Sequence, residues 1–91
     1  MATTVRIPTP LRRLTNGQDK LEIESANVFE MIDSMESEFP GFKERLLDEN
    51  GELRYFVNIY LNGEDVRFLE GVATPISSGD EISIVPAVAG G

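Results

Sequence analysis

The sequence predicts a single α+β domain in which a mixed sheet of about five strands packs on one main helix. Ninety-one residues with 41% hydrophobic content are enough for one core and too few for two. Apolar and polar residues alternate in segments near both ends and in the second half of the chain, as in half-buried strands. One stretch with helical spacing lies between these segments, so strands surround a central helix.

The first expected element is an antiparallel hairpin. Thr3 to Ile7 alternates as a strand, and Pro8 and Pro10 confine the next residues to an edge or a bend. Asn16-Gly17 predicts a two-residue turn, because both residue types tolerate a positive φ. Lys20 to Glu24 alternates again and forms the second strand.

The helix is predicted to begin after Asn27, whose side chain can cap it, with Glu30 three residues further on. Pro40-Gly41 ends it. Its apolar face consists of Val28, Met31, Ile32, Met35 and Phe39. Its other face carries four carboxylates, Glu30, Asp33, Glu36 and Glu38. We interpret this face as solvated, because no ligand of another type joins the carboxylates to form a metal or acid-base site.

The second half of the chain is predicted to complete the sheet. A short helical turn over Phe42 to Leu47 and a polar loop lead into a strand over Tyr55 to Leu61. Asn62-Gly63 then turns the chain into a short strand over Val66 to Phe68. A last strand over Glu81 to Val85 follows the Gly79-Asp80 turn, and Pro86 stops it.

This order of a hairpin, a crossing helix and later strands is the β-grasp arrangement of ubiquitin-like proteins. Plant-type ferredoxins share it but need cysteines to hold their cluster, and this chain has none. Residues 1–86 are therefore predicted to form the β-grasp domain, and residues 87–91 a flexible C-terminal tail ending in Gly-Gly.

Composition narrows the function. The chain has neither histidine nor cysteine, which excludes Ser-His and Cys-His dyads and the usual zinc sites, so we expect no catalytic residues and no metal. A net charge of −8 repels nucleic acid and anionic membranes. No segment is apolar enough for a spanning helix or a signal peptide. We therefore expect a cytoplasmic protein, monomeric when free.

Charge is distributed unevenly along the chain. Residues 1–18 carry Arg6, Arg12 and Arg13 and no acidic residue, whereas residues 19–52 carry eleven acidic residues against three basic ones. The acidic stretch is typical of a solvated surface, and the alternative is a surface that steers a basic partner. The arginines could form an anion cradle in a small acylphosphatase-like hydrolase, but no nucleophile or base lies next to them in the sequence, and we interpret them as decorating an edge strand.

The last segment, from Gly79-Asp80 through Ile82-Ser83-Ile84-Val85-Pro86 to Gly90-Gly91, resembles the C-terminus of the ThiS/MoaD family of ubiquitin-like sulfur carriers. Residues 56–68, FVNIYLNGEDVRF, resemble the CysO branch of that family, which supplies sulfur for cysteine biosynthesis. With Ile7-Pro8-Thr9 and Leu11, the resemblance covers most of the chain.

The resemblance implies a site at the C-terminus. The carboxylate of Gly91 would be adenylated by an E1-like adenylyltransferase that consumes ATP, and then converted to a thiocarboxylate. The tail that enters the partner's active site would comprise Ala87, Val88, Ala89 and Gly90. No cofactor would be bound by the carrier itself. The acceptor would be a pyridoxal-phosphate-dependent (PLP-dependent) cysteine synthase.

Two alternatives use the same tail. The chain could be the small subunit of molybdopterin synthase, acting with that enzyme's large subunit. It could also be a ubiquitin-like protein modifier that transfers activated Gly91 to lysines of target proteins.

A partner-docking patch is predicted on the sheet. Phe56 and Tyr60 alternate with the core positions of their strand, and Val85 of the last strand is expected near them. Exposed aromatic side chains on a sheet face with no second helix over it favour binding of a partner enzyme, with Glu64 and Asp65 at a polar rim.

Overall fold

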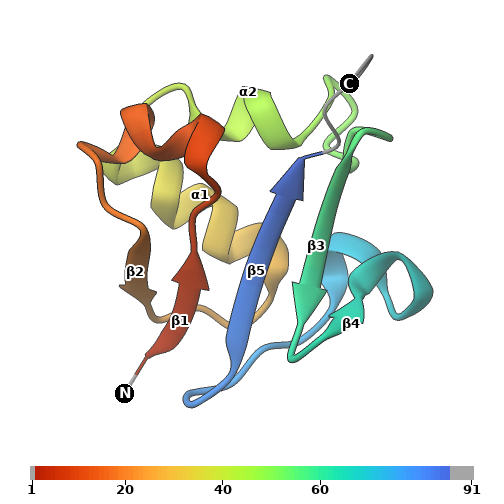
Figure 1. The fold of residues 1–91 in the computed structure, drawn as a ribbon. Coiled ribbons are helices and arrows are strands. Elements are labelled where there is room, and N and C mark those ends of the chain that lie inside the picture. The colour runs from red at the N-terminus through yellow and green to blue at the C-terminus, as the bar shows by residue number, and fades with distance from the viewer. Residues whose placement is uncertain (1, 87–91) are drawn as a thin grey trace.

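The computed structural model describes residues 2–86, and the predicted tail, Ala87 to Gly91, lies outside the described residues. Five strands form one sheet, in the order β2-β1-β5-β3-β4 (Figure 1). The strands are β1 (Thr3–Arg6), β2 (Lys20–Ile23), β3 (Val57–Leu61), β4 (Glu64–Asp65) and β5 (Glu81–Pro86). The helices are α1 (Val28–Glu38), α2 (Phe42–Leu46) and three 3-10 helices, η1 (Thr9–Thr15), η2 (Val66–Phe68) and η3 (Gly71–Ala73).

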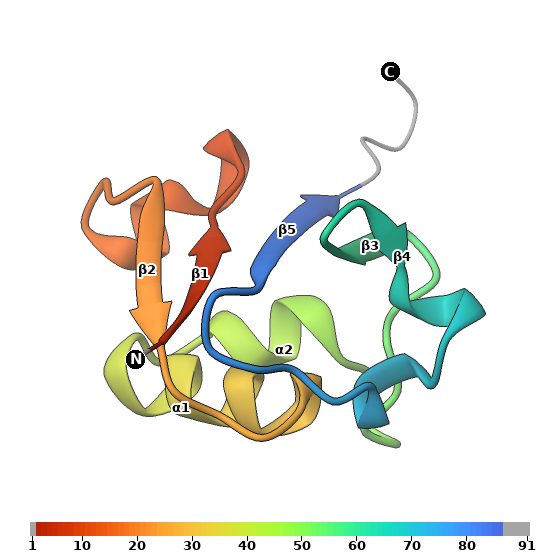
Figure 2. The ribbon, with the colours of Figure 1, turned by 90° about the horizontal axis from the view of Figure 1, so that it is seen from below.

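The sheet is mixed, as predicted. β1 and β5 run parallel at its centre, while the β1–β2, β3–β5 and β3–β4 pairs are antiparallel. Both α-helices lie on the same side of the sheet, which Figure 2 shows from below. The α+β, β-grasp prediction is confirmed, with α2 as a short addition to the main helix.

The helix α1 forms where the cap and the apolar spacing predict it. The backbone N–H of Glu30 donates to Asn27 Oδ1 at 2.8 Å, which satisfies one of the unpaired donors of the first turn. Four residues of α1 are buried against the sheet: Val28, Met31, Ile32 and Met35.

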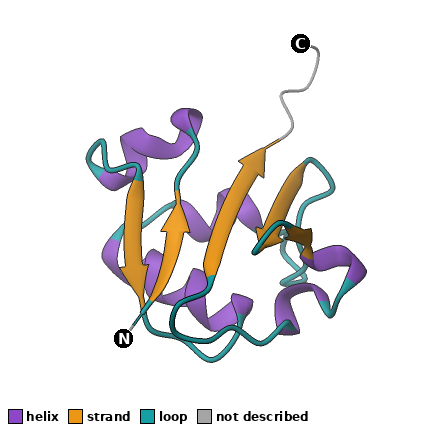
Figure 3. Cartoon of the chain, turned by 60° about the horizontal axis from the view of Figure 1, so that its bottom comes forward, coloured by secondary structure: helices purple, strands orange, loops and turns teal. Residues whose placement is uncertain are grey.

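The core lies between the helices and one face of the sheet. Val57 and Ile59 of β3 and Ile82 and Ile84 of β5 are at most 2% exposed. Because side chains alternate along a strand, Asn58, Tyr60, Ser83 and Val85 belong to the opposite face. In Figure 3, no helix crosses that face in front of β3 and β5.

The connection in the first hairpin differs from the prediction. β1 and β2 pair as expected, but residues 9–15 between them form η1 and not a bend followed by a two-residue turn. Asn16, at φ 56°, and Gly17, at φ 85°, instead end this 3-10 helix. Both residues adopt the predicted positive φ, but the same backbone geometry ends helices as well as turning hairpins.

In the second hairpin, the short strand begins two residues earlier than predicted. Asn62-Gly63 makes the predicted turn, but the short strand is Glu64–Asp65, and residues 66–68 form η2. Asp65 Oδ1 accepts the backbone N–H of Arg67 at 2.8 Å and so caps η2. Val66 is therefore buried from a helical turn and not from a strand.

The predicted ends of the strands differ from the observed ends more than the predicted positions of the strands do. β3 begins at Val57, leaving Tyr55 and Phe56 in a turn, and β5 continues through Pro86, which pairs with Val57. Among residues 2–86, no helix has the length and hydropathy that a membrane crossing requires.

Candidate functional site

The last described strand leads directly to the predicted tail. β5 lies between β1 and β3, and its pairing with β3 continues to its final residue, Pro86. The predicted activated residue, Gly91, and the tail residues 87–90 follow this strand in the sequence but lie outside the described residues. The position from which the tail starts is thus fixed by central sheet pairing (Figure 1).

Two of the three predicted docking residues lie on the same face of the sheet. Asn58 of β3 stands opposite Val85 of β5, and Tyr60 stands opposite Ser83, so Tyr60 and Val85 are diagonal neighbours across the two strands. Val85 is 44% exposed and Tyr60 is half-buried. On the same face, directly opposite Val85, Asn58 Oδ1 accepts a hydrogen bond from Arg67 Nη1 at 2.6 Å, so the face is not purely apolar.

The third predicted docking residue, Phe56, lies in the turn before β3 and not within the strand. Strand alternation therefore does not decide its direction, although it is 36% exposed. Its ring packs edge-on against Tyr55, with the ring centroids 5.4 Å apart. Tyr55 is 91% exposed, and a strand over Tyr55 to Leu61 does not single it out as a docking residue.

A hollow of about 330 Å³ lies beside the C-terminal end of β5, from which the tail continues. Because β1 and β5 are parallel, the end of β1 lies next to the end of β5, and Arg6 pairs with Ser83 in the sheet. The hollow is lined by Arg6, Ile7, Pro8, Thr9, Arg12, Asp19, Ser83, Ile84 and Val85. The interpretation that the arginines lie on an edge strand was wrong for all three: Arg6 is on β1, which lies between β2 and β5, and Arg12 and Arg13 are on η1.

The three arginines have different surroundings. Arg6 Nε pairs with Glu81 Oε2 at 2.8 Å, and Arg12 Nε donates to the carbonyl oxygen of Ile7 at 3.0 Å. Arg13 is exposed on η1 and does not line the hollow. No sequence signal indicated this hollow except the basic character of residues 1–18.

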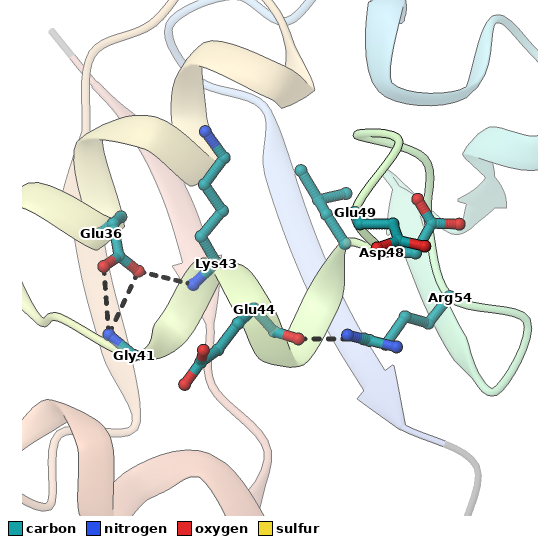
Figure 4. A pocket seen from close by; sticks show the side chains of 8 residues that line it. Glu36, Gly41, Lys43, Glu44, Asp48, Glu49 and Arg54 are labelled. Carbon is teal, nitrogen blue, oxygen red and sulfur yellow. Dashed lines mark hydrogen bonds between the residues drawn. The ribbon is translucent and has the colours of Figure 1, made fainter.

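A second hollow, of about 480 Å³, lies between the end of α1, α2 and the loop after it (Figure 4). Glu36 accepts the backbone N–H groups of Lys43 and, less strongly, Gly41, and these bonds hold the pKa of Glu36 below its usual value. Arg54 Nε donates to the carbonyl oxygen of Glu44 at 2.9 Å. The side chains of Glu36 and Arg54 are thus hydrogen-bonded to backbone groups, and we assign no chemistry to this hollow.

The carboxylate face of α1 is partly structural. Asp33 pairs with Lys43 Nζ at 2.7 Å, and Glu36 caps α2, so neither fits a purely solvated interpretation. Sequence reasoning missed both contacts, which bridge the Pro40-Gly41 break. Within residues 2–86, no group of three or more acidic side chains is placed to hold a metal ion.

Comparison with known proteins assigns the family. The sequence profile of the ThiS family matches residues 5–91, which is nearly the whole chain. The chain belongs to the ThiS family.

Individual relatives agree with this assignment to the ThiS family. The chain is 47% identical over 93 aligned residues to the sulfur carrier protein CysO of Mycobacterium tuberculosis, with 100% of each chain covered. It also matches a chain in the crystal structure of the Amycolatopsis orientalis BexX/CysO complex, with a TM-score of 0.93 and 48% identity. That match covers 99% of this chain and 100% of the other.

A further relative bears on the alternatives. Small archaeal modifier protein 3 of Haloferax volcanii is 41% identical over 68 residues, which cover 75% of this chain and 73% of that protein.

The predicted resemblance to the ThiS/MoaD family and its CysO branch is confirmed, and with it the prediction of a sulfur carrier.

Proposed function

We propose that the carboxylate of Gly91 is adenylated by an E1-like enzyme, converted to a thiocarboxylate, and used as the sulfur donor of a PLP-dependent cysteine synthase. The observation that carries the proposal is the full-length similarity to CysO, a sulfur carrier, together with a family match that includes residues 87–91. Catalysis belongs to the partner enzymes, and Gly91 is a substrate group.

The chemistry follows from the nature of a terminal carboxylate. Its pKa lies near 3.3 to 3.7 in model peptides, so at neutral pH it is an anion and a poor electrophile. In the activation step, a carboxylate oxygen attacks the α-phosphorus of ATP and pyrophosphate leaves. A sulfur nucleophile then attacks the acyl carbon, AMP leaves, and a thiocarboxylate remains. Because the chain has no cysteine thiol, its terminus is the place where it can carry transferable sulfur.

The tail sequence suits entry into a partner. Glycine lacks a Cβ, so a Gly-Gly ending suits passage through a narrow channel and can adopt backbone angles closed to other residues. Five residues from Ala87 reach roughly 17 Å when extended, at about 3.3 to 3.6 Å each. Pro86, held in the sheet, would remain outside while the carboxylate reaches the reacting groups.

The partner enzymes are proposed to dock on a patch formed by Phe56, Tyr60 and Val85, to which the structure adds Tyr55. The support is geometric: Tyr60 and Val85 are diagonal neighbours on the sheet face opposite the helices, and β5 leads from there to the tail. Tyr55 and Phe56 expose aromatic surface at the start of β3. Aromatic side chains of this kind supply most of the binding energy in many interfaces.

A protein-modifier role is a second candidate, favoured by the similarity to small archaeal modifier protein 3. In that role, the lysine amine of a target would attack the adenylated acyl carbon, AMP would leave, and an isopeptide bond would form. The activation step is the same as in the carrier role.

One experiment separates these roles. The protein is incubated with ATP, a sulfide source and a candidate E1-like enzyme, and the mass of the C-terminal peptide is measured. A gain equal to the mass difference between sulfur and oxygen supports the carrier, whereas conjugates on lysines of other proteins support the modifier. A separate pull-down from a lysate, with this protein as bait, tests the acceptor. Recovery of a molybdopterin synthase large subunit in place of a PLP-dependent synthase would change the acceptor assignment.

Deletion of Gly91 is the matched control for this experiment. We expect the shortened chain to gain no sulfur while keeping its cooperative thermal transition, because substitutions and deletions at chain termini are usually tolerated. If the shortened chain still gains sulfur, the proposed site is wrong.

A further inference from the structure

We propose that the hollow beside the end of β5 holds the anionic C-terminus of this same chain when no partner is bound. The residues that form this binding site are Arg6 and Arg12, with Ile7 and Thr9 beside them and Val85 at the edge. The proposal rests on the proposed function in one respect, namely that Gly91 carries a free carboxylate.

The position of the hollow supports this occupant. Parallel pairing of β1 with β5 places Arg6 next to Ser83, and the chain leaves β5 three residues later, after Pro86. Val85 lines the hollow, and one residue, Pro86, separates it from the start of the tail at Ala87. Residues 87–91 span up to roughly 17 Å, which is enough to turn back over one neighbouring strand about 4.8 Å away.

The charge of the hollow also favours an anion. Arg6 and Arg12 line it, and Asp19 is the acidic residue among the lining side chains. The ion pairs formed within residues 2–86 are Arg6 with Glu81 and Lys43 with Asp33, so Arg12 has no carboxylate partner there. Because Glu81 already pairs with Arg6, Arg12 is the lining group that can take up a further anion, and a guanidinium is the side chain best suited to bind a carboxylate.

Arg12 is held in place by the protein itself. Its Nε donates to the carbonyl oxygen of Ile7 at 3.0 Å, which fixes one edge of the guanidinium against the end of β1. The two Nη groups belong to the same planar fork and supply the remaining donors. A carboxylate or thiocarboxylate reaching the hollow meets a donor whose orientation is already set.

This site would connect tail release to partner docking. Val85 belongs both to the hollow and to the proposed docking patch, so a partner that covers Val85 competes with the bound tail. The tail would then be freed when a partner enzyme is in position to receive it. An exposed ion pair of this type is weak, so the bound and free forms exchange readily.

The test is an NMR comparison of the free, full-length protein. In one arm, the backbone amide signals of Gly90 and Gly91 are compared among wild type, Arg12→Gln and Arg13→Gln. Arg13 is the matched control, since it lies next to Arg12 on η1 but does not line the hollow. In the second arm, the terminal carboxylate is blocked as an amide, and the signals of Arg12 Nε–H, Ile7 and Thr9 are followed.

We expect Arg12→Gln to shift the Gly90 and Gly91 signals and Arg13→Gln to leave them in place. Blocking the carboxylate should shift the Arg12 Nε–H signal, and 1 M salt should remove both differences by screening. Equal shifts in the two arginine variants, or no change at Arg12 on blocking the carboxylate, would overturn the proposal. Neither result would affect sulfur loading by the E1-like enzyme, so the proposed function is tested separately.

Discussion

At the scale of single residues, Glu36 shows how one carboxylate joins two helices. It lies near the end of α1 and accepts the backbone N–H groups of Gly41 and Lys43, which open α2 after the Pro40-Gly41 break. The N-terminus of a helix has unpaired N–H donors, so a carboxylate placed there satisfies them. These bonds favour the charged form and lower the pKa of Glu36 from its usual 4.5.

The lowered pKa of Glu36 predicts how the stability of the fold depends on pH. A carboxyl whose pKa is lower in the folded state stabilises the fold above its unfolded pKa, and this contribution is lost as the pH falls through the folded pKa. We therefore expect Glu36→Gln to be less stable than wild type at neutral pH, with the difference shrinking below about pH 4.5. Urea unfolding at a series of pH values measures this. Glu38→Gln, which removes a carboxylate from an exposed position on α1, is the control for the change of charge at neutral pH.

Two buried isoleucines test the assignment of strand faces. Ile59 and Ile84 are 0% and 2% exposed and stand opposite each other on β3 and β5. Replacing either by alanine should lower the free energy of unfolding by roughly 2 to 5 kcal/mol, because the cavity is not refilled. Val85→Ala, one residue further on the exposed face, should change it by less than about 0.5 kcal/mol. Denaturant melts in which Ile84→Ala costs under about 1 kcal/mol would contradict the described core.

At the scale of elements, the β3–β4 hairpin depends on backbone geometry at its turn. Asn62 and Gly63 have φ values of 50° and 91°, the pair of positive angles that matches the twist of a two-residue hairpin. The side chain of Asn62 also binds the start of β5: its Oδ1 accepts the backbone N–H of Glu81 at 2.9 Å, and its Nδ2 donates to Asp80 at 3.1 Å. One turn residue thus attaches an edge hairpin to a central strand.

Gly63→Ala isolates the backbone contribution of this turn. An added Cβ would meet no atom within 4 Å, so the cost arises from the positive φ alone. We expect a loss of about 1 to 2 kcal/mol in the free energy of unfolding. Glu64→Ala, an exposed residue in the same hairpin, serves as the control and should be close to neutral. A neutral Gly63→Ala would show that the turn changes its geometry at little cost.

At the scale of the whole molecule, the layers separate the core from the recognition surface. Both α-helices cover one face of the sheet (Figure 2). The register of β3 and β5 puts Tyr60 and Val85 on the other face, near the end of β5 from which the tail continues. A partner that contacts this face and receives the tail would bind the protein at two places. The same arrangement leaves the acidic face of α1 on the opposite side of the molecule.

Alanine substitutions test the docking patch. Phe56→Ala and Tyr60→Ala should each weaken binding to the E1-like enzyme or the acceptor by roughly 1 to 3 kcal/mol, since buried aromatic anchors contribute on this scale. Phe68→Ala is the control, because Phe68 is 87% exposed but lies on η2, outside the patch. Calorimetric titration measures the affinity, and a denaturant melt of each variant checks the fold. Unchanged affinity in both patch variants would leave the tail as the recognised element.

The sequence by itself determined those features that depend on neighbouring residues. Alternation with a period of two marked the buried positions of β3 and β5, and the spacing after Asn27 marked α1 together with its cap. The positive-φ preference of Asn16-Gly17 and Asn62-Gly63 was also readable, because it is a property of the residues themselves. The Gly-Gly ending and residues 56–68 indicated the family, which the comparisons confirmed.

Only the tertiary structure decided which distant residues meet. The parallel pairing of β1 with β5 places Arg6, and Arg12 of the following η1, in the same hollow as Val85, more than seventy positions away along the chain, and no local pattern encodes that arrangement. The capping of α2 by Glu36 and the bond from Arg67 to Asn58 likewise require packed elements. The physical reason is that backbone preferences and burial periodicity act within a few residues, whereas pairing across the sheet is set by the packing of the whole core.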